Sequence, residues 1–365
     1  MTEVAASRLG ALDLLRGVTV AAMIVVNNPG NWNAVLPPLT HAAWDGLTFA
    51  DLIFPLFIFI MGVALGLSAG AGRPLDARGL RRVLTRGGLL IGLGLVLNLA
   101  ASWDAPLQAR IPGVLQRIGV VYVAAALIAR SSPPRRQWVW VFALLALQST
   151  AVLLGGPEHG RNLGAWLDRM VFGHHTLSAA GDPEGLIGVP TSIATALLGA
   201  AAARLLVPDG GRGRVPDGPW RLAAGSAVAL AAGACLTALV PLNKSLWTAS
   251  FTLVTGGLAG LCLSACVPLS QGPTAGSLRP FDWLGTNPLA IYFCSELGAI
   301  LLQQPVLTRA GHPAAPKDLL FWNVLVPLSG GTGGPLASLA YALAYTAVWV
   351  GVAGLLHRRG IRLRV

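Results

Sequence analysis

A histidine, a tryptophan and two aspartates stand within residues 41–51, directly before an apolar run rich in Phe and Ile that ends at Gly62. A histidine side chain takes up and releases a proton near neutral pH, and its neutral nitrogen can attack a thioester. The alternative is an interfacial histidine that only hydrogen-bonds lipid headgroups or backbone. We predict acid–base or acyl-transfer chemistry at His41.

The two aspartates of this stretch have different sequence contexts. Thr48 and Asp51 form a Thr-x-x-Asp pattern, which is typical of a helix N-terminus closed by a side-chain cap. Asp45 stands four residues from His41, and we predict that this carboxylate orients the imidazole. Trp44 is either a residue of the aromatic belt at the membrane interface or a substrate-binding residue.

Asn27 follows an apolar run and precedes Asn28-Pro29-Gly30. A buried amide at the end of a membrane helix must find hydrogen-bond partners. The sequence alone favours a structural tie for Asn27, with oxyanion stabilisation as the alternative.

Three further polar residues, Gln116, Arg117 and Glu296, fall inside apolar runs. Ionisable groups are costly within a bilayer and usually face a cavity or a partner. Their roles are either a ligand pathway or a buried ion pair. Asp13 and Arg16 are one helical turn apart and can pair with each other.

Composition defines the class of protein. With 54% hydrophobic and 11% charged residues and a mean hydropathy of +0.65, the 365-residue chain has too little polar surface for a soluble globule. We expect an all-α, polytopic membrane helix bundle that forms one domain over residues 1–365. About ten runs approach the ~20 residues needed to cross a bilayer, at 13–32, 48–70, 83–101, 113–130, 138–155, 186–206, 222–240, 248–270, 283–303 and 336–356.

Basic residues indicate the orientation. With a cytoplasmic N-terminus, 19 of the 26 Lys and Arg residues fall on the inner side, including Arg73, Arg212, Arg214 and Arg364. The positive-inside rule therefore predicts that both termini are cytoplasmic. The formal net charge of +11 is spread in short clusters between apolar runs, which favours lipid headgroups over nucleic acid as its partner.

The cysteines do not indicate a metal centre or a disulfide framework. All four lie in apolar runs, where cysteine behaves as a small hydrophobe, and no His or carboxylate completes a ligand set beside them. We expect no metal. The N-terminal residues lack the pattern of a removable signal peptide. The four are Cys235, Cys262, Cys266 and Cys294.

Seven motifs, taken together and in this order, resemble the heparan-alpha-glucosaminide N-acetyltransferase family of transmembrane acyltransferases. They extend from the first expected span to the ninth, and the match is specific only when they are read jointly. The motifs are LDLLRG (12–17), VN (26–27), HAAWDGLTFADLIFP (41–55), RIPGVLQRIG (110–119), DPEGL (182–186), PLNKSLW (241–247) and LGTNP (284–288).

The resemblance implies transfer of an acetyl group from cytosolic acetyl-CoA to the amine of a terminal glucosamine on the far side of the membrane. The essential histidine of the family matches His41, and its nearby asparagine matches Asn27, so the resemblance makes Asn27 a predicted catalytic residue and no longer only a structural tie. We predict that His41 is a base or a transient acyl acceptor. Arg16, Gln116 and Arg117 are predicted to bind acetyl-CoA, and the predicted acceptor-binding residues are Trp44, Asn243, Lys244 and Glu296.

We expect the chain to differ from the lysosomal members by the absence of their large luminal domain before the first shared span. Its Ala-, Gly- and Arg-rich composition favours a bacterial inner membrane, and an amino sugar of the cell envelope is then the expected acceptor. A homodimer is a candidate assembly. The rival functions are an O-acyltransferase acting on a polysaccharide hydroxyl and a secondary transporter, which should show paired broken helices near the middle of the membrane.

Overall fold

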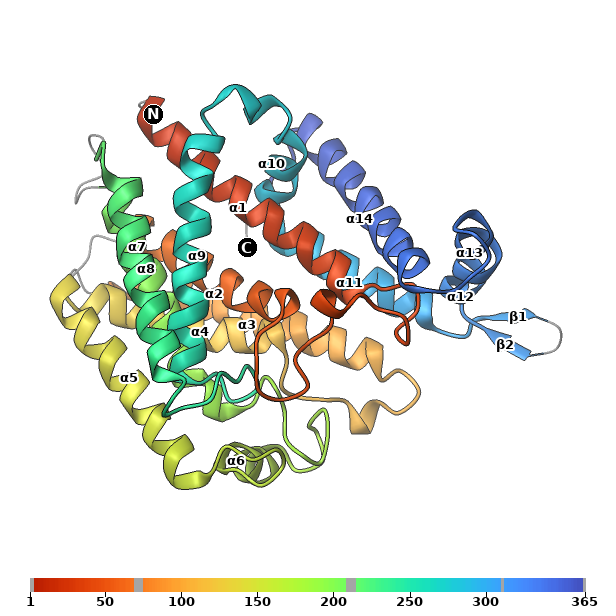
Figure 1. Cartoon of the computed structure of the whole chain (residues 1–365), viewed down its shortest axis with the longest axis horizontal. Coiled ribbons are helices and arrows are strands. Elements are labelled where there is room, and N and C mark those ends of the chain that lie inside the picture. Colours follow the sequence, from red (N-terminus) through yellow and green to blue (C-terminus); the bar gives the residue numbers. More distant parts are fainter. Residues whose placement is uncertain (1–2, 69–74, 208–214, 310–311, 364–365) are drawn as a thin grey trace. The chain divides into compact units, whose positions relative to one another are not determined.

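The computed structural model describes residues 3–68, 75–207, 215–309 and 312–363. Almost all regular structure in these ranges is helical, as expected for an all-α bundle (Figure 1). Four arginines that were counted in the charge asymmetry lie outside the described residues: Arg73, Arg212, Arg214 and Arg364.

The chain forms two compact units that interleave along the sequence. Unit 1 contains Met1–Leu12, Ala42–Leu47 and Phe54–Pro273, and unit 2 contains Asp13–His41, Thr48–Ile53 and Thr274–Val365. Two helices contribute residues to both units, α1 (Glu3–Asn27) and α2 (Phe49–Ser68).

Unit 1 holds the larger group of helices. In it, α8 and α9 pack side by side, as do α3 and α4, and α5 and α7 (Figure 1). Its further elements are α3 (Ala77–Ala101), η2 (Pro106–Gln108), α4 (Val114–Ser131), α5 (Pro134–Gly155), α6 (Leu163–Phe172), η3 (Leu186–Gly188), α7 (Val189–Leu206), α8 (Gly218–Leu236) and α9 (Ala249–Leu269).

Unit 2 combines most of α1 with the C-terminal helices and a short antiparallel hairpin that pairs Leu307 with Ala314. Its other elements are η1 (Pro37–Leu39), α10 (Arg279–Thr286), α11 (Pro288–Gln303), β1 (Leu307–Arg309), β2 (His312–Ala314), α12 (Pro316–Leu320), η5 (Phe321–Leu325), α13 (Val326–Leu328) and α14 (Pro335–Arg358), with η4 (Pro273–Gly276) at its boundary.

Within the described ranges, nine helices are long and apolar enough to cross a membrane, one fewer than the ten expected. The difference lies in the expected span 283–303, which the structure divides into α10 and α11 at Asn287-Pro288. Proline lacks a backbone N–H and disfavours helical geometry at the residue before it. Asn287 accordingly adopts φ −131° and ψ 49°, and the apolar helix after it has only 16 residues.

Close contact between α2 and α7 shapes the middle of unit 1. A β-carbon on Gly62 would lie 1.9 Å from the carbonyl oxygen of Ala196, and one on Gly199 would lie 2.1 Å from that of Phe59. Small residues allow membrane helices to approach at such distances.

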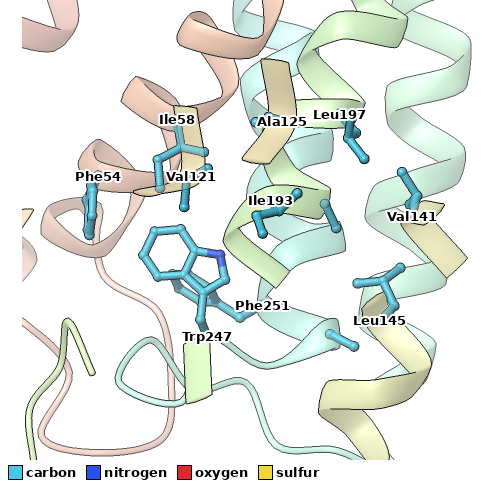
Figure 2. Close-up of a cluster of buried hydrophobic side chains, with 13 residues drawn as sticks. Phe54, Ile58, Val121, Ala125, Val141, Leu145, Ile193, Leu197, Trp247 and Phe251 are labelled. Carbon is cyan, nitrogen blue, oxygen red and sulfur yellow. The ribbon is translucent and has the colours of Figure 1, made fainter. Parts of the chain in front are cut away.

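The largest buried side chain of unit 1 is Trp247, at the end of the loop before α9. Its indole lies among Phe54 and Ile58 of α2 and Ile193 of α7 (Figure 2). The ring centroids of Trp247 and Phe54 are 4.9 Å apart and the rings meet edge to face, a favourable aromatic geometry.

Candidate active site

His41 and Asp51 form the clearest arrangement for chemistry. Asp51 lies in the first turn of α2, is 1% exposed, and places Oδ1 2.8 Å from Nδ1 of His41. Its other oxygen, Oδ2, accepts hydrogen bonds from the backbone N–H and the hydroxyl of Thr48, at 3.2 and 3.0 Å. Asp51 therefore closes the helix, as the Thr-x-x-Asp pattern indicated, and contacts the histidine as well.

The carboxylate determines how the imidazole can act. A carboxylate beside Nδ1 favours the tautomer in which Nδ1 carries the proton, so that Nε2 carries the lone pair. The side chain of His41 is 52% exposed, whereas that of Asp51 is almost fully covered. This combination of an accessible imidazole and a buried orienting carboxylate suits a general base or a nucleophile.

The partner predicted for His41 was Asp45, and the structure assigns Asp45 a different bond. Its Oδ1 accepts a hydrogen bond of 3.0 Å from Nδ2 of Asn243, and the two residues also form an isolated β-bridge. Proximity in the sequence favoured Asp45, but the loop folds so that the first turn of α2 meets His41. The residue beside Nδ1 of His41 is therefore Asp51, and the orienting role of a carboxylate stays a prediction.

Asn243 was predicted to bind substrate, but it is fully buried and bonded within the protein. Its Nδ2 also donates to the carbonyl of Trp44 (3.1 Å), and its Oδ1 accepts from the backbone N–H of Leu246 (2.8 Å). These bonds join the loop around Trp44 to the PLNKSLW turn. Lys244 is partly exposed in the same turn. We conclude that Asn243 positions the loop around Trp44.

The same turn ends in an unusual backbone conformation. Trp247 has φ +48°, a region that a bulky residue rarely occupies. Its carbonyl accepts a 2.6 Å hydrogen bond from the hydroxyl of Thr191, and its indole N–H donates to the hydroxyl of Thr195 at 3.2 Å. The motif is therefore held by α7 through specific hydrogen bonds.

Asn27 and Glu296 come together within unit 2 although 269 positions separate them. Asn27 is the last residue of α1, and its Nδ2 donates to Oε1 of Glu296 in α11 at 2.8 Å. This bond gives the buried amide of Asn27 a partner, and its predicted catalytic role stays a prediction. Because an amide has two N–H groups, the tie leaves one for another acceptor.

Arg110 lies at the centre of an ion network in unit 1. Its Nε donates to Oδ2 of Asp182 at 2.7 Å, and its Nη2 pairs with both Asp182 and Glu184. Burial alone would lower the pKa of Arg110, but the hydrogen bond to Asp182 and the charges of both acids outweigh burial and raise it. The motifs RIPGVLQRIG and DPEGL therefore meet in one buried network.

Arg117 is 2% exposed and lies near this network. Its Nη2 donates to the carbonyl of Gly185 at 2.6 Å, and its guanidinium lies 5.2 Å from the ring centre of Trp247 and 5.9 Å from that of Phe54. Gln116 is also buried and donates to the carbonyl of Ile111 at 3.0 Å. Within the described part of the chain, Nε and Nη1 of Arg117 and Oε1 of Gln116 are buried without a hydrogen-bond partner. Binding of acetyl-CoA by these two residues stays a prediction.

The remaining predicted acetyl-CoA residue is Arg16, whose Nη1 lies 3.0 Å from Oδ1 of Asp13. This pair was the alternative that the sequence offered. Among the described residues, no three His, Cys, Asp or Glu side chains are grouped to hold a metal ion.

Sequence reasoning missed two features of the site. It assigned Asp51 only a capping role, although a carboxylate at a helix start can also face the loop before it. It also identified Arg110 and the DPEGL motif without joining them. The sequence did contain a signal for this pairing. One family motif carries a positive charge at Arg110, and another carries negative charges at Asp182 and Glu184.

The fold and the site define a class of protein: an integral membrane protein with a histidine–carboxylate pair suited to acyl transfer. The sequence profile described as "Heparan-alpha-glucosaminide N-acetyltransferase, catalytic" matches residues 8–216, more than half of the chain. The chain belongs to this family.

Two curated relatives match almost the whole chain. The heparan-alpha-glucosaminide N-acetyltransferase of Homo sapiens is 27% identical over 97% of this chain, and that of Mus musculus is 26% identical over the same share. The chain spans only about three fifths of their length, 59% and 60% respectively.

Proposed function

We propose that the protein is a transmembrane N-acetyltransferase that moves an acetyl group from cytosolic acetyl-CoA to the amine of a glucosamine-type sugar on the outer face. The observation that carries this proposal is the contact of 2.8 Å between the exposed imidazole of His41 and the buried carboxylate of Asp51. Membership of the acetyltransferase family supports the reaction type.

The first route uses His41 as a general base. Nε2 removes a proton from the sugar amine while the amine nitrogen forms a bond to the carbonyl carbon of the thioester. The C–S bond then breaks, and the proton passes to the thiolate of CoA. Asp51 stabilises the transient imidazolium through Nδ1, because a buried carboxylate attracts that charge.

The second route uses His41 as a nucleophile. Nε2 attacks the thioester carbonyl, the C–S bond breaks, and CoA leaves as a thiolate that takes up a proton. The sugar amine then attacks the acetyl-imidazole, loses a proton and releases His41. In both routes the second N–H of Asn27 donates to the carbonyl oxygen as negative charge develops there.

We propose a smaller set of substrate contacts than the sequence suggested. We propose Arg16, which is partly exposed, for the phosphates of acetyl-CoA, because a guanidinium pairs well with phosphate. Trp44 and Lys244 remain proposed acceptor contacts, and we propose positioning roles for Gln116, Arg117 and Asn243. Glu296 acts through its bond to Asn27.

The proposed setting is a bacterial inner membrane, with both termini cytoplasmic and residues 1–365 acting as one catalytic domain. Lipids surround the helices, and a homodimer remains a proposed assembly. The Ala-, Gly- and Arg-rich composition and the excess of basic residues on one side support this setting.

Labelled acetyl-CoA tests the proposed function when it is incubated with the purified protein and a panel of sugars. We expect label on glucosamine as an amide that resists mild alkali. Label on neutral sugars as an alkali-labile ester would indicate an O-acyltransferase. Uptake of a sugar into vesicles without any acetyl transfer would indicate a transporter and overturn the proposal.

A second experiment separates the two routes. The protein is mixed with labelled acetyl-CoA in the absence of acceptor, quenched and digested. Label on the peptide that contains His41 supports the nucleophile, and turnover without labelled peptide supports the base.

A further inference from the structure

A cavity of about 200 Å3 lies beside Trp44, entirely within unit 1. Its wall combines an aromatic face with side chains that can donate or accept hydrogen bonds, a mixture typical of small-molecule sites. Neither a lysine nor an arginine lines it among the described residues. The polar and aromatic side chains of the wall include Trp44, His159, Asn162, Asp168, Asp182 and Ser245.

Trp44 lines this cavity and is held by two hydrogen bonds. Its indole N–H donates to the carbonyl of Pro157 at 2.8 Å, and its backbone carbonyl accepts from Asn243 at 3.1 Å. The ring of His159 lies 4.5 Å from it, tilted by 48°. A fixed indole offers a flat apolar surface to the C–H face of a sugar ring, whose hydroxyls then point to the rim.

Two carboxylates, those of Asp168 and Asp182, belong to the lining. Asp168 accepts from the backbone N–H groups of Leu186 (2.9 Å) and Asp182 (3.2 Å), and Asp182 is held by Arg110. A carboxylate in a lining favours hydroxyl and ammonium donors over an anionic ligand, and Asp168 supplies it here because Asp182 is already paired with Arg110. The lining therefore suits a neutral or amino sugar.

We propose that this cavity is a subsite for one pyranose ring of the acceptor, stacked on Trp44, and that it selects neutral or amino sugars over sugars that carry a carboxylate or sulfate. The inference rests on the proposed function for the identity of the acceptor. The chain connection supports it, because three residues of backbone reach at most about 11 Å from His41 to Trp44.

Binding is measured by calorimetry on the purified, detergent-solubilised protein, without acetyl-CoA. The probes are the β-1,4-linked disaccharide of glucosamine and a disaccharide in which one ring is a uronic acid. Trp44→Ala removes the platform, and Ala180→Trp fills the cavity from a small lining residue. Trp166→Ala is the matched control, because this exposed tryptophan of α6 is not part of the lining.

We expect Trp44→Ala and Ala180→Trp each to weaken binding of the glucosamine disaccharide roughly tenfold, the size of one aromatic stacking contact. Trp166→Ala should leave it unchanged, and the uronic probe should bind more weakly to the wild type. If Trp44→Ala fails to fold, the disaccharide affinities of Trp44→Phe and Ala180→Trp take its place as the test of the subsite.

Equal affinity of all variants, preference for the uronic probe, or no binding to the wild type would each overturn the subsite. Failure of the proposed function gives a different result, because labelled acetyl-CoA would then yield no acetylated sugar while the disaccharide still binds. Failure of the subsite alone leaves acetyl transfer to glucosamine intact in the wild type and disaccharide binding unchanged in Ala180→Trp.

Discussion

Two regions of this chain concentrate charge, and they are built in opposite ways. At the start of α2, Asp51 is buried while its partner His41 is 52% exposed. In the network of unit 1, Arg110 is only 23% exposed, and its acidic partners Asp182 and Glu184 are 0% and 8% exposed. The first region presents one reactive side chain outward, whereas the second turns its charges inward.

The difference separates a reactive group from a supporting one. A base or a nucleophile must reach its substrate, so exposure of one partner is required. A buried ion network gains little net stability from its charges, but loss of one partner leaves the other uncompensated. We therefore expect variants at His41 to change the rate and variants at Arg110 to change the stability.

The largest expected effect is on catalysis at His41. His41→Ala should lower the rate of acetyl transfer to glucosamine by roughly a hundred- to ten-thousandfold, the usual contribution of a positioned acid–base group. The measurement is the initial rate of label transfer from acetyl-CoA. His174→Ala, at another exposed histidine, is the matched control and should keep the wild-type rate.

The next effect is on folding at Arg110. Arg110→Ala leaves Asp182 and Glu184 buried without their cation, which should cost about 3–5 kcal/mol of stability. Thermal unfolding in detergent measures the loss, with the exposed Arg161→Ala as control. An unfolding midpoint equal to that of the wild type would show that the network does not support the fold.

A smaller effect distinguishes the two aspartates near His41. Asp51→Asn removes the charge that orients the imidazole and should lower kcat roughly ten- to a hundredfold with little change in KM. Asp45→Asn alters a side chain bonded to Asn243 and should keep kcat. The reverse ranking would restore Asp45 as the orienting residue.

The smallest effect is a pH dependence at Asp168. Burial raises the pKa of Asp168 above its ordinary value of 3.8, although hydrogen bonds from Leu186 and Asp182 partly oppose this. A carboxyl with a raised folded pKa stabilises the fold below the unfolded pKa, and this contribution is lost as pH rises through the folded pKa. The stability of the wild type relative to Asp168→Asn should therefore fall as pH rises from about 4. A relative stability that grows over this range would contradict the assignment.

The sequence predicted the fold class and most spans because long apolar runs are a strong local signal. It did not predict that the run 283–303 divides, because hydropathy averages over the break that Pro288 imposes. It also located His41 and Asn27 through the family motifs.

The sequence did not predict which side chains contact His41 and Asn27. Asp51 was set aside in favour of Asp45, which is nearer in sequence, because a loop can reverse direction within ten residues. Asn27 and Glu296 are 269 positions apart in the sequence, and no local sequence pattern predicts their contact. Similarly, burial of Arg117 and Asn243 follows from packing and not from residue type.

The most direct test of the central claim places His41→Ala and Arg110→Ala on one plot of acetyl-transfer rate per folded molecule against unfolding midpoint. We predict that His41→Ala unfolds at the wild-type midpoint but transfers acetyl groups far more slowly. Arg110→Ala should unfold at a lower midpoint, while its folded molecules keep most of the wild-type transfer rate. A His41→Ala protein that still transfers acetyl groups at the wild-type rate would contradict the claim.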